Sequence, residues 1–452
     1  MLRLAPKKQE SPGRQEKGRQ EKVGRVDIKR ATRIIQEVIQ EPAELGEEEA
    51  LQNKEILENA MAGVPGANER AVKAIASTLE RLGVEVEEMN LRQAAYEIYK
   101  YAWGLGPIED LYHDPSINEI RVNAPDRVYV LKNIRNEKTE VRFRDDEHVM
   151  KIITRITLHD RGVALNRSNP TIESMRKDGT RITATCPPVT EHVTLVLRKP
   201  FARVVTPEEL VRLGTLDERT WLVLETLVAG RANVIIAGGT GSGKTTLLRT
   251  LFSATPPNAR AVVLETDREL FLAKMFPDRD IIEMEEHPEA GRTLGGLFKI
   301  VLRYSPNLII VGEFRAAGEA KEAVRACIRG HDGSLVTAHF GSPKEAIEGT
   351  GKLLLEEGMN LPLEVAVSFV ASAYHVVVQM FGDSTKGVIK VESVTEVCPN
   401  GSKIEYRDLV RWVPKGDDYF EGSWKVCSPP SPRLLERLRR HLPVSKLRRL
   451  GW

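Results

Sequence analysis

One stretch of the chain constrains the fold more than any other. Residues 234–247 read Val-Ile-Ile-Ala-Gly-Gly-Thr-Gly-Ser-Gly-Lys-Thr-Thr-Leu, in which an apolar run leads into the pattern Gly-x-x-x-x-Gly-Lys-[Ser/Thr]. A new apolar period begins at Leu247. A buried strand, a glycine-rich turn and a helix form the context in which this pattern cradles phosphates. The sequence therefore predicts a nucleotide-triphosphate site on a P-loop, rather than an ordinary glycine-rich turn.

The residue types in this loop match the requirements of phosphate binding. Glycines let the backbone turn tightly, so that N–H groups and the start of the helix point at a phosphate. Lys244 supplies a cation for the β- and γ-phosphates, and Thr245 a hydroxyl for Mg²⁺. We expect ATP to contact residues Gly238, Gly239, Thr240, Gly241, Ser242, Gly243, Lys244, Thr245 and Thr246.

Two further apolar runs, residues 308–311 and 261–264, lead into Glu313 and Glu265. The carboxyl ends of parallel strands converge on the crevice where ligands bind, so both carboxylates are expected near the phosphates. A single glutamate after a strand more often only solvates a loop. Two of them in a P-loop domain favour roles in the Mg²⁺ shell, with Thr245, and in activating water.

Two histidines bracket another apolar run, within residues 330–339. His339 comes at the end of the predicted strand, where its ring is expected to contact the γ-phosphate. His331 precedes the strand and is a second candidate for nucleotide binding. No pattern typical of metal ligands accompanies them.

Apolar periodicity divides the chain into regions. From Pro207 onwards, strand and helix patterns alternate as a parallel sheet requires, and residues 375–380 and 387–397 read as strands paired across a short loop. The predicted divisions are a basic, partly disordered or helical extension at 1–68, a helical segment at 69–104, an α+β domain at 105–200, a linker at 201–207, an α/β ATPase domain at 208–412 and a basic tail at 413–452.

Composition excludes several classes of protein. The chain of 452 residues is 41% apolar with a formal net charge of +2, and it contains no apolar run of eighteen residues, so we expect a cytoplasmic protein without a membrane span. Both termini are basic. The last 25 residues carry seven Lys/Arg and one acid, and they either contact a partner or membrane surface or pack their leucines on the body.

Several motifs together resemble the type II/type IV secretion ATPase superfamily, and most closely its tight-adherence (Tad) pilus assembly ATPases. They lie in order along roughly residues 70–412: 104–109 and 114–123 in the N-terminal domain, the P-loop, the acidic stretch 264–270, the region 303–315 around Glu313, and the histidine stretch 330–339. The absence of C-x-x-C pairs argues against the zinc-bearing type II branch.

The resemblance implies a RecA-like ATPase domain, a hexameric ring and nucleotide bound between two domains. It implies that Arg181, Arg198 and Arg303 neutralise charge on the transferred phosphoryl group, and that the motor acts on an inner-membrane platform protein to assemble a pilus or secrete protein. Two positions depart from the family pattern: Thr266 stands where an Asp is usual, and Met175-Arg176 replaces an Arg-Leu order.

Three other functions fit parts of this pattern. A conjugative or protein-secretion ATPase of the same superfamily would carry the same motifs. A RecA-like nucleic-acid translocase is supported only by the basic termini, because a net charge of +2 and 6% aromatic residues provide no extended basic groove; no nucleic-acid partner is therefore expected. A non-catalytic nucleotide-binding scaffold is disfavoured because every phosphate-handling residue type is present.

Overall fold

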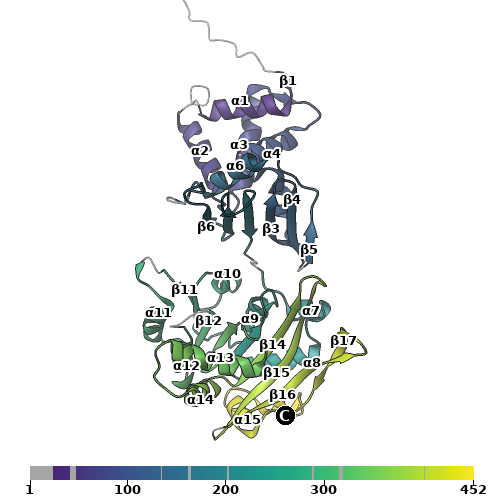
Figure 1. Cartoon of the computed structure of the whole chain (residues 1–452). Coiled ribbons are helices and arrows are strands. Elements are labelled where there is room, and N and C mark those ends of the chain that lie inside the picture. The colour runs from purple at the N-terminus through teal and green to yellow at the C-terminus, as the bar shows by residue number, and fades with distance from the viewer. Residues whose placement is uncertain are drawn as a thin grey trace, which may run out of the picture. The chain divides into compact units, whose positions relative to one another are not determined.

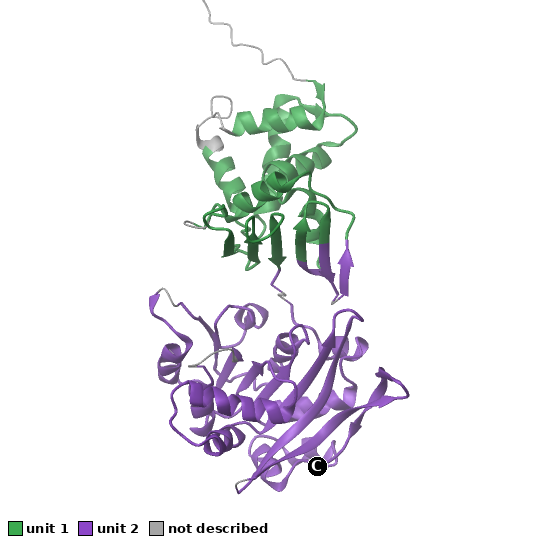
Figure 2. Cartoon of the chain, viewed as in Figure 1, with its two compact units in different colours: residues 1–115, 120–128, 139–198 green, residues 116–119, 129–138, 199–452 purple. Residues whose placement is uncertain are grey.

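The structure is a computed structural model that describes residues 24–40, 47–133, 135–160, 164–200, 203–287, 290–314, 319–401 and 403–452. Most of the basic segment expected to be disordered, residues 1–23, lies outside these ranges. The chain forms two compact units, which Figure 2 colours separately. The first comprises residues 1–115, 120–128 and 139–198, and the second comprises residues 116–119, 129–138 and 199–452.

Four helices lie before the first sheet of the first unit: α1 (Ile28–Gln40), α2 (Glu47–Met61), α3 (Ala67–Leu82) and α4 (Leu91–Ala102). Asn90 starts α4 with a capping box, its side chain accepting from Gln93 N while the Gln93 side chain accepts from Asn90 N. The short strands β1 (Arg25–Val26) and β2 (Glu85–Val86) pair in parallel beside them. Their core is made by fully buried residues such as Ile35, Ile75, Leu79 and Ile98.

A six-stranded sheet follows, with the order β5-β4-β3-β8-β7-β6. Its strands are β3 (Ile117–Ala124), β4 (Arg127–Lys132), β5 (Arg135–Lys138), β6 (Thr171–Met175), β7 (Arg181–Thr185) and β8 (Thr194–Arg198), accompanied by η2 (Gly106–Ile108), α5 (Glu109–His113) and α6 (Asp146–Thr157). Alternate residues of β7 and β8 are buried, which leaves one face apolar and the other polar. The α+β character predicted for this region is present.

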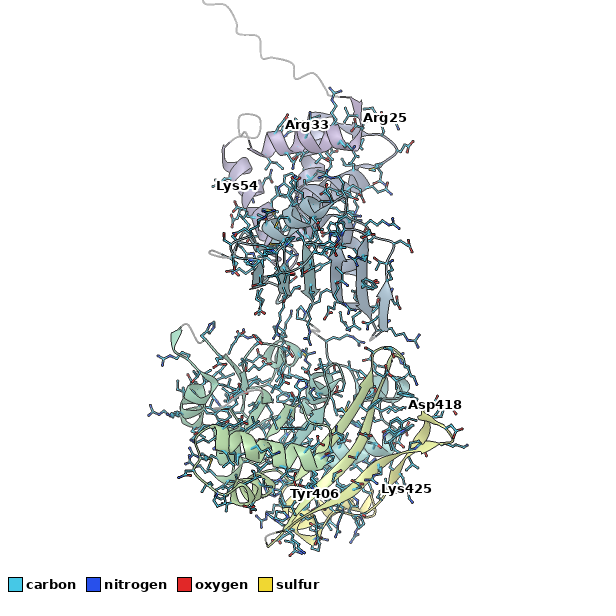
Figure 3. The ribbon with its side chains drawn as sticks, viewed as in Figure 1. Arg25, Arg33, Lys54, Tyr406, Asp418 and Lys425 are labelled. Atoms are coloured by element: carbon cyan, nitrogen blue, oxygen red, sulfur yellow. The ribbon has the colours of Figure 1, made fainter. Side chains whose placement is uncertain are left out.

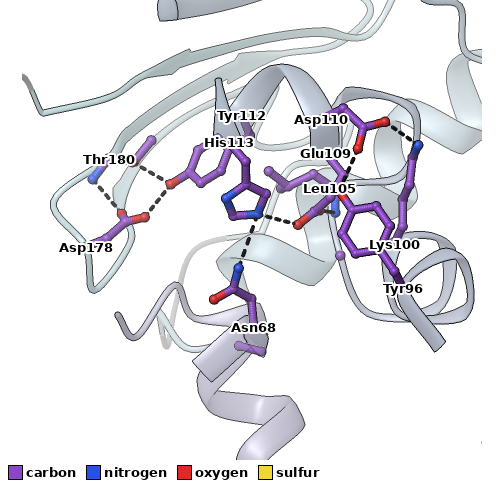
Figure 4. Close-up of polar contacts among 12 residues, drawn as sticks. Asn68, Tyr96, Lys100, Leu105, Glu109, Asp110, Tyr112, His113, Asp178 and Thr180 are labelled. Atoms are coloured by element: carbon purple, nitrogen blue, oxygen red, sulfur yellow. Dashed lines mark hydrogen bonds and ion pairs between the residues drawn. The ribbon is translucent and has the colours of Figure 1, made fainter. Parts of the chain in front are cut away.

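A polar network ties the helices to this sheet (Figure 4). His113 Nε2 lies 2.9 Å from Glu109 Oε1 and 3.4 Å from Asn68 Nδ2, while Tyr112 bonds Asp178 in the turn before β7. Arg176, whose equivalent position departs from the family pattern, is 7% exposed and donates from Nη2 to the Ala60 carbonyl at 3.1 Å. Arg176 therefore joins two layers of the first unit.

The second unit is built on a nine-stranded sheet with the order β11-β10-β12-β13-β9-β14-β15-β16-β17 (Figure 1). The strands from β11 to β14 in this order are parallel, and β15 to β17 are added antiparallel. The bounds are β9 (Val234–Gly238), β10 (Ala261–Glu265), β11 (Ile281–Glu285), β12 (Leu308–Phe314), β13 (Leu335–Ala338), β14 (Val376–Asp383), β15 (Val388–Asn400), β16 (Lys403–Lys415) and β17 (Asp418–Val426).

Helices cover both faces of the parallel part, so its central strands are buried on both sides, whereas β11 at the edge is half-exposed. Val234 and Ile236 of β9 enter one apolar core, and Ile235 and Ala237 enter the other. The helices are α7 (Pro207–Arg212), α8 (Glu218–Ala229), α9 (Lys244–Phe252), α10 (Leu272–Met275), α11 (Leu294–Val301), η4 (Leu302–Tyr304), α12 (Glu319–Ile328), α13 (Pro343–Glu356), α14 (Leu363–Ala373), α15 (Pro432–Arg439) and α16 (Val444–Arg448). The predicted α/β fold with a parallel-sheet core is confirmed.

The antiparallel extension differs from the predicted division of the chain. The pairing of β14 with β15 is as expected, with Asp383 opposite Val388. However, β16 runs across residue 412, where we placed the end of the ATPase domain, and β17 continues the same sheet. Figure 3 labels Tyr406 on β16 and Asp418 and Lys425 on β17. The segment predicted as a tail therefore belongs to the second unit.

Candidate nucleotide-binding site

The P-loop joins β9 to α9 in the predicted way. All five residues of β9 are buried, while Gly239, Thr240 and Gly241 are exposed and open to a ligand. Gly241 and Gly243 have φ angles of 73° and 86°, a left-handed conformation that favours glycine. The loop therefore turns directly into the N-terminus of α9, which favours bound anions.

Lys244 is held at the loop by its own backbone. Its Nζ atom donates to the carbonyls of Gly238 at 3.0 Å and Gly239 at 2.9 Å, and the side chain is largely buried. The same Nζ lies 3.3 Å from His339 Nδ1. An incoming phosphate would compete with these acceptors for the ammonium group.

His339 connects the P-loop lysine to a strand-end carboxylate. It follows β13, which lies between β9 and β12 in the sheet, and its Nε2 contacts Oε1 of Glu313 on β12. A neutral ring protonated at Nε2 would donate to Glu313 and accept from Lys244 at Nδ1. The side chain of Glu313 is 16% exposed and that of His339 is 41% exposed. The three side chains thus form a continuous polar chain at the edge where the parallel strands end.

Glu265 ends β10 at the same edge but faces the backbone. Its Oε1 accepts from Glu269 N at 2.9 Å and Leu270 N at 2.8 Å. Burial raises the pKa of this carboxyl to about 7, against the lowering effect of those two hydrogen bonds. Glu265 therefore shapes the acidic loop that follows β10.

Arg249 of α9 holds the same loop from the other side. Its guanidinium donates to the carbonyls of Glu269 and Leu270, and burial lowers its pKa to about 10. Sequence reasoning missed this residue, although a basic residue two turns into the P-loop helix is visible in the sequence. The acidic loop is thereby attached directly to the phosphate-binding helix.

Thr266 occupies the position where the family usually has an Asp. Its hydroxyl donates to Oε1 of Glu319 at 3.2 Å, and Glu319 is 5% exposed. An aspartate here would place a second negative charge beside that buried carboxylate, which is destabilising. A neutral threonine at position 266 is therefore compatible with Glu319, the buried acid that α12 supplies.

The β14–β15 hairpin also lies against the P-loop, which the sequence did not indicate. A Cβ on Gly382 would be 2.7 Å from Ser242 Cα, and Ile389 packs on Gly243. Glycine at 382 is the one signal of this close approach. The antiparallel extension is thus in direct contact with the phosphate-binding loop.

Two expected nucleotide ligands lie elsewhere in the second unit. Arg303 is exposed in η4, before β12 begins, and His331 lies before β13 with Nδ1 3.3 Å from the Pro306 carbonyl. Both residues are at the edge where the parallel strands start, opposite the edge that carries the P-loop. The structure therefore does not bring them to the phosphate loop of the same chain.

Arg181 and Arg198 belong to the first unit. They are cross-strand partners on β7 and β8, on the polar face of the six-stranded sheet. Arg181 is half-buried and Arg198 is exposed. Their register places both arginines at one end of the paired strands, on the same face of the sheet.

The oxygen donors at the P-loop fit the magnesium ion that accompanies a nucleotide. Mg²⁺ prefers oxygen ligands, keeps several waters and takes few protein ligands when phosphates also bind it. Thr245 is half-buried at the start of α9, and Glu313 offers a carboxylate on the same sheet edge. In the described residues, no cluster of three or more His, Cys, Asp or Glu forms an independent metal site.

Known proteins share extended sequence similarity with this chain. The sequence model of the family described as "Type II/IV secretion system protein" matches residues 102–406. The type IV secretion system protein VirB11 of Brucella suis is 28% identical over 294 residues, covering 58% of this chain and 80% of that protein. A putative conjugal transfer protein of Mycobacterium tuberculosis is 29% identical over 255 residues, covering 54% and 70%.

A solved structure, the VirB11 ATPase of Brucella suis in complex with sulphate, is 26% identical. The match covers 66% of this chain and 94% of that one, with a TM-score of 0.35.

Among the described residues, no helix is both long and apolar enough to cross a membrane.

Proposed function

Because the chain belongs to the family of type II/IV secretion system proteins, we propose that it is an ATPase that couples ATP hydrolysis to pilus assembly or protein secretion. The observation that carries this proposal is the polar chain from Lys244 through His339 to Glu313. It links the phosphate-binding lysine to a carboxylate that can activate water, and a passive nucleotide-binding scaffold needs no such link.

In the proposed reaction, the P-loop N–H groups and Lys244 bind the β- and γ-phosphates of ATP. Thr245 and Glu313 supply oxygen ligands to Mg²⁺, which neutralises charge on those phosphates. Glu313 also orients or deprotonates the attacking water, while Glu265 positions the acidic loop and leaves that step to Glu313. Arg181 and Arg198 are candidates to stabilise charge on the transferred phosphoryl group, as the family resemblance implies.

The motif pattern supports a homohexameric motor in the cytoplasm that acts on an inner-membrane platform protein. A pilus motor of the tight-adherence kind is the more specific form of this proposal. A second candidate is an ATPase of a conjugative or type IV secretion system, as the two relatives described above are named.

The test is phosphate release by the purified full chain in the presence of MgATP. We expect turnover, with a rise on adding membranes that contain the cognate platform protein. A chain that binds ATP but releases no phosphate under either condition would contradict the enzymatic proposal. Stimulation by membranes carrying a conjugation channel, and not by those carrying a pilus platform, would favour the second candidate.

A further inference from the structure

The C-terminal helices α15 and α16 are fixed to the body of the second unit. Their leucines are buried in the same apolar core as β9 and α9: Leu434, Leu438, Leu442, Leu447 and Leu450. Ser431 caps α15 by accepting from Leu434 N at 3.2 Å, and its own N–H donates to Glu396 on β15 at 2.8 Å. These leucine side chains are therefore unavailable for insertion into a lipid bilayer.

The outward side of the same helices is strongly basic. Residues 428–452 carry seven Lys/Arg and one acid, whereas the whole chain has a formal net charge of only +2. We define the C-terminal basic surface by its six exposed cations: Arg433, Arg439, Arg440, Lys446, Arg448 and Arg449. The single acid, Glu436, lies 3.2 Å from Arg440. Residues 428–452 thus carry a net charge of +6 (seven Lys/Arg less one acid) in a chain whose formal net charge is +2.

This surface covers the sheet edge opposite the P-loop. Arg437 pairs with Asp332, which precedes β13, at 2.6 Å, and Leu438 packs against Gly230, which precedes β9. Both contacts are with the starts of parallel strands, and the P-loop follows the end of β9. A partner bound here leaves the nucleotide edge accessible.

Charges from separate elements converge beside α15. Arg231, in the turn before β9, joins Arg437 and Arg440 in lowering the pKa of His441, after the larger effect of burial, and Asp332 opposes them. The positive field is therefore shared between the helix and the loop beneath it.

We propose that the C-terminal basic surface docks this protein on a bilayer of anionic phospholipids. A membrane presents a plane of phosphates, and a localised basic surface can meet that plane without an extended track of charge. A nucleic-acid strand is the poorer fit, because residues 428–452 contain one aromatic residue, Trp452, which is partly buried against the core. The inference is independent of ATP turnover.

The experiment is co-sedimentation of the full chain with vesicles of phosphatidylcholine alone or with one third phosphatidylglycerol. We expect binding only to the anionic vesicles at low salt, and its loss at high salt, because the leucines are buried and the exposed surface is mainly charged, with Val444 its one large exposed apolar residue among the described ones. Each basic residue near an anionic surface strengthens binding by about fivefold. The triple variant Arg439→Glu, Lys446→Glu, Arg448→Glu should therefore bind at least about 100-fold more weakly.

The matched control reverses three exposed lysines elsewhere in the same unit, Lys274, Lys299 and Lys352, and should keep vesicle binding. A neutral triple variant, with Gln at the same three C-terminal positions, should give an intermediate loss, and its melting temperature reports folding. Binding to neutral vesicles, binding that survives high salt, or equal losses in both triple variants would overturn the proposal. Binding of the wild-type chain to a single-stranded oligonucleotide, but not to vesicles, would also overturn it.

Discussion

Two histidine–glutamate pairs in different units use the same side chains in different surroundings. His113 and Glu109 are one turn apart on α5, 2.9 Å from each other, and the other oxygen of Glu109 accepts from Leu105 N. Glu313 is on β12 and His339 follows the neighbouring strand β13, and the other ring nitrogen of His339 faces the P-loop lysine. In the first pair, Glu109 also contacts a buried backbone N–H group. In the second pair, His339 also contacts the ammonium group of Lys244, which a bound phosphate can attract.

The third partner of each pair distinguishes a structural histidine–glutamate pair from a candidate reactive one. Glu109 has a side chain 2% exposed and is surrounded by the groups shown in Figure 4. Glu313 is more exposed and lies at the edge where the strands end. Replacing corresponding members of the two sites should therefore affect different measurements.

The largest expected effect is on ATP turnover, and it distinguishes Lys244 of the P-loop from Lys100 of the first unit. Lys244→Ala should lower ATP turnover by about 100-fold or more, because it removes the charge that stabilises the phosphates. Lys100, which pairs with Asp110 in the first unit, is the matched control. Lys100→Ala should lower the melting temperature and leave kcat close to wild type. Equal turnover in both variants would remove the distinction between the sites.

The two glutamates give the next contrast. Glu313→Gln should retain ATP binding and lose about 100-fold in hydrolysis, the usual contribution of a positioned general base. Glu109→Gln should destabilise the fold by about 1–3 kcal/mol, because a buried backbone N–H loses a charged acceptor. Nucleotide binding by fluorescence titration, together with phosphate release, measures the first, and denaturant unfolding measures the second. Normal hydrolysis by Glu313→Gln would place the base elsewhere.

Replacing His339 or His113 should give a smaller difference in kcat between the two sites. His339→Ala should lower kcat by about tenfold, because Glu313 loses the group that orients it. His113→Ala should change the melting temperature alone. Steady-state kinetics of both variants at saturating MgATP would decide, and a fall in kcat for His113→Ala would show that the first pair is coupled to the chemistry.

Glu265 adds a contrast that depends on pH, because it resembles Glu109 in accepting from backbone N–H groups. Its folded pKa of about 7 lies above the ordinary value of 4.5. The folded carboxyl therefore keeps its proton where the unfolded one has lost it, and this contribution to stability is lost as pH rises from about 4.5 to 7. Relative to wild type, Glu265→Gln should gain melting temperature between pH 5 and 7.5. A constant difference across that range would contradict the assignment.

Continuous apolar runs made part of this fold predictable. The strand Ala261–Glu265 was predicted within its observed bounds because all five residues are buried. The strand β11 was missed because Ile281–Glu285 carries two glutamates and is half-exposed at an edge of the sheet, so it lacks a continuous apolar run. The strands β16 and β17 were missed because charged residues at their exposed positions interrupt the apolar pattern.

The site shows the same limit. Motif spacing identified the residues at the ends of the strands, since a strand end is adjacent in sequence to its loop. Motif spacing also predicted that Arg303 and His331 bind the nucleotide. Both residues precede their strands, and they therefore lie at the opposite edge of the parallel sheet. Gly382 contacts Ser242 only because the β14–β15 hairpin packs against the P-loop. Local sequence patterns do not indicate such contacts between residues far apart in the chain.

The course of β16 across residue 412 has a practical consequence for protein production. A chain shortened at that residue would lose the end of β16 and the whole of β17, together with the leucines that α15 and α16 add to the core. The remaining sheet would present an unpaired edge beside exposed apolar side chains, the combination that recruits further strands. We expect such a fragment to aggregate on expression, and a fragment starting near residue 203 and ending at Trp452 to stay dispersed.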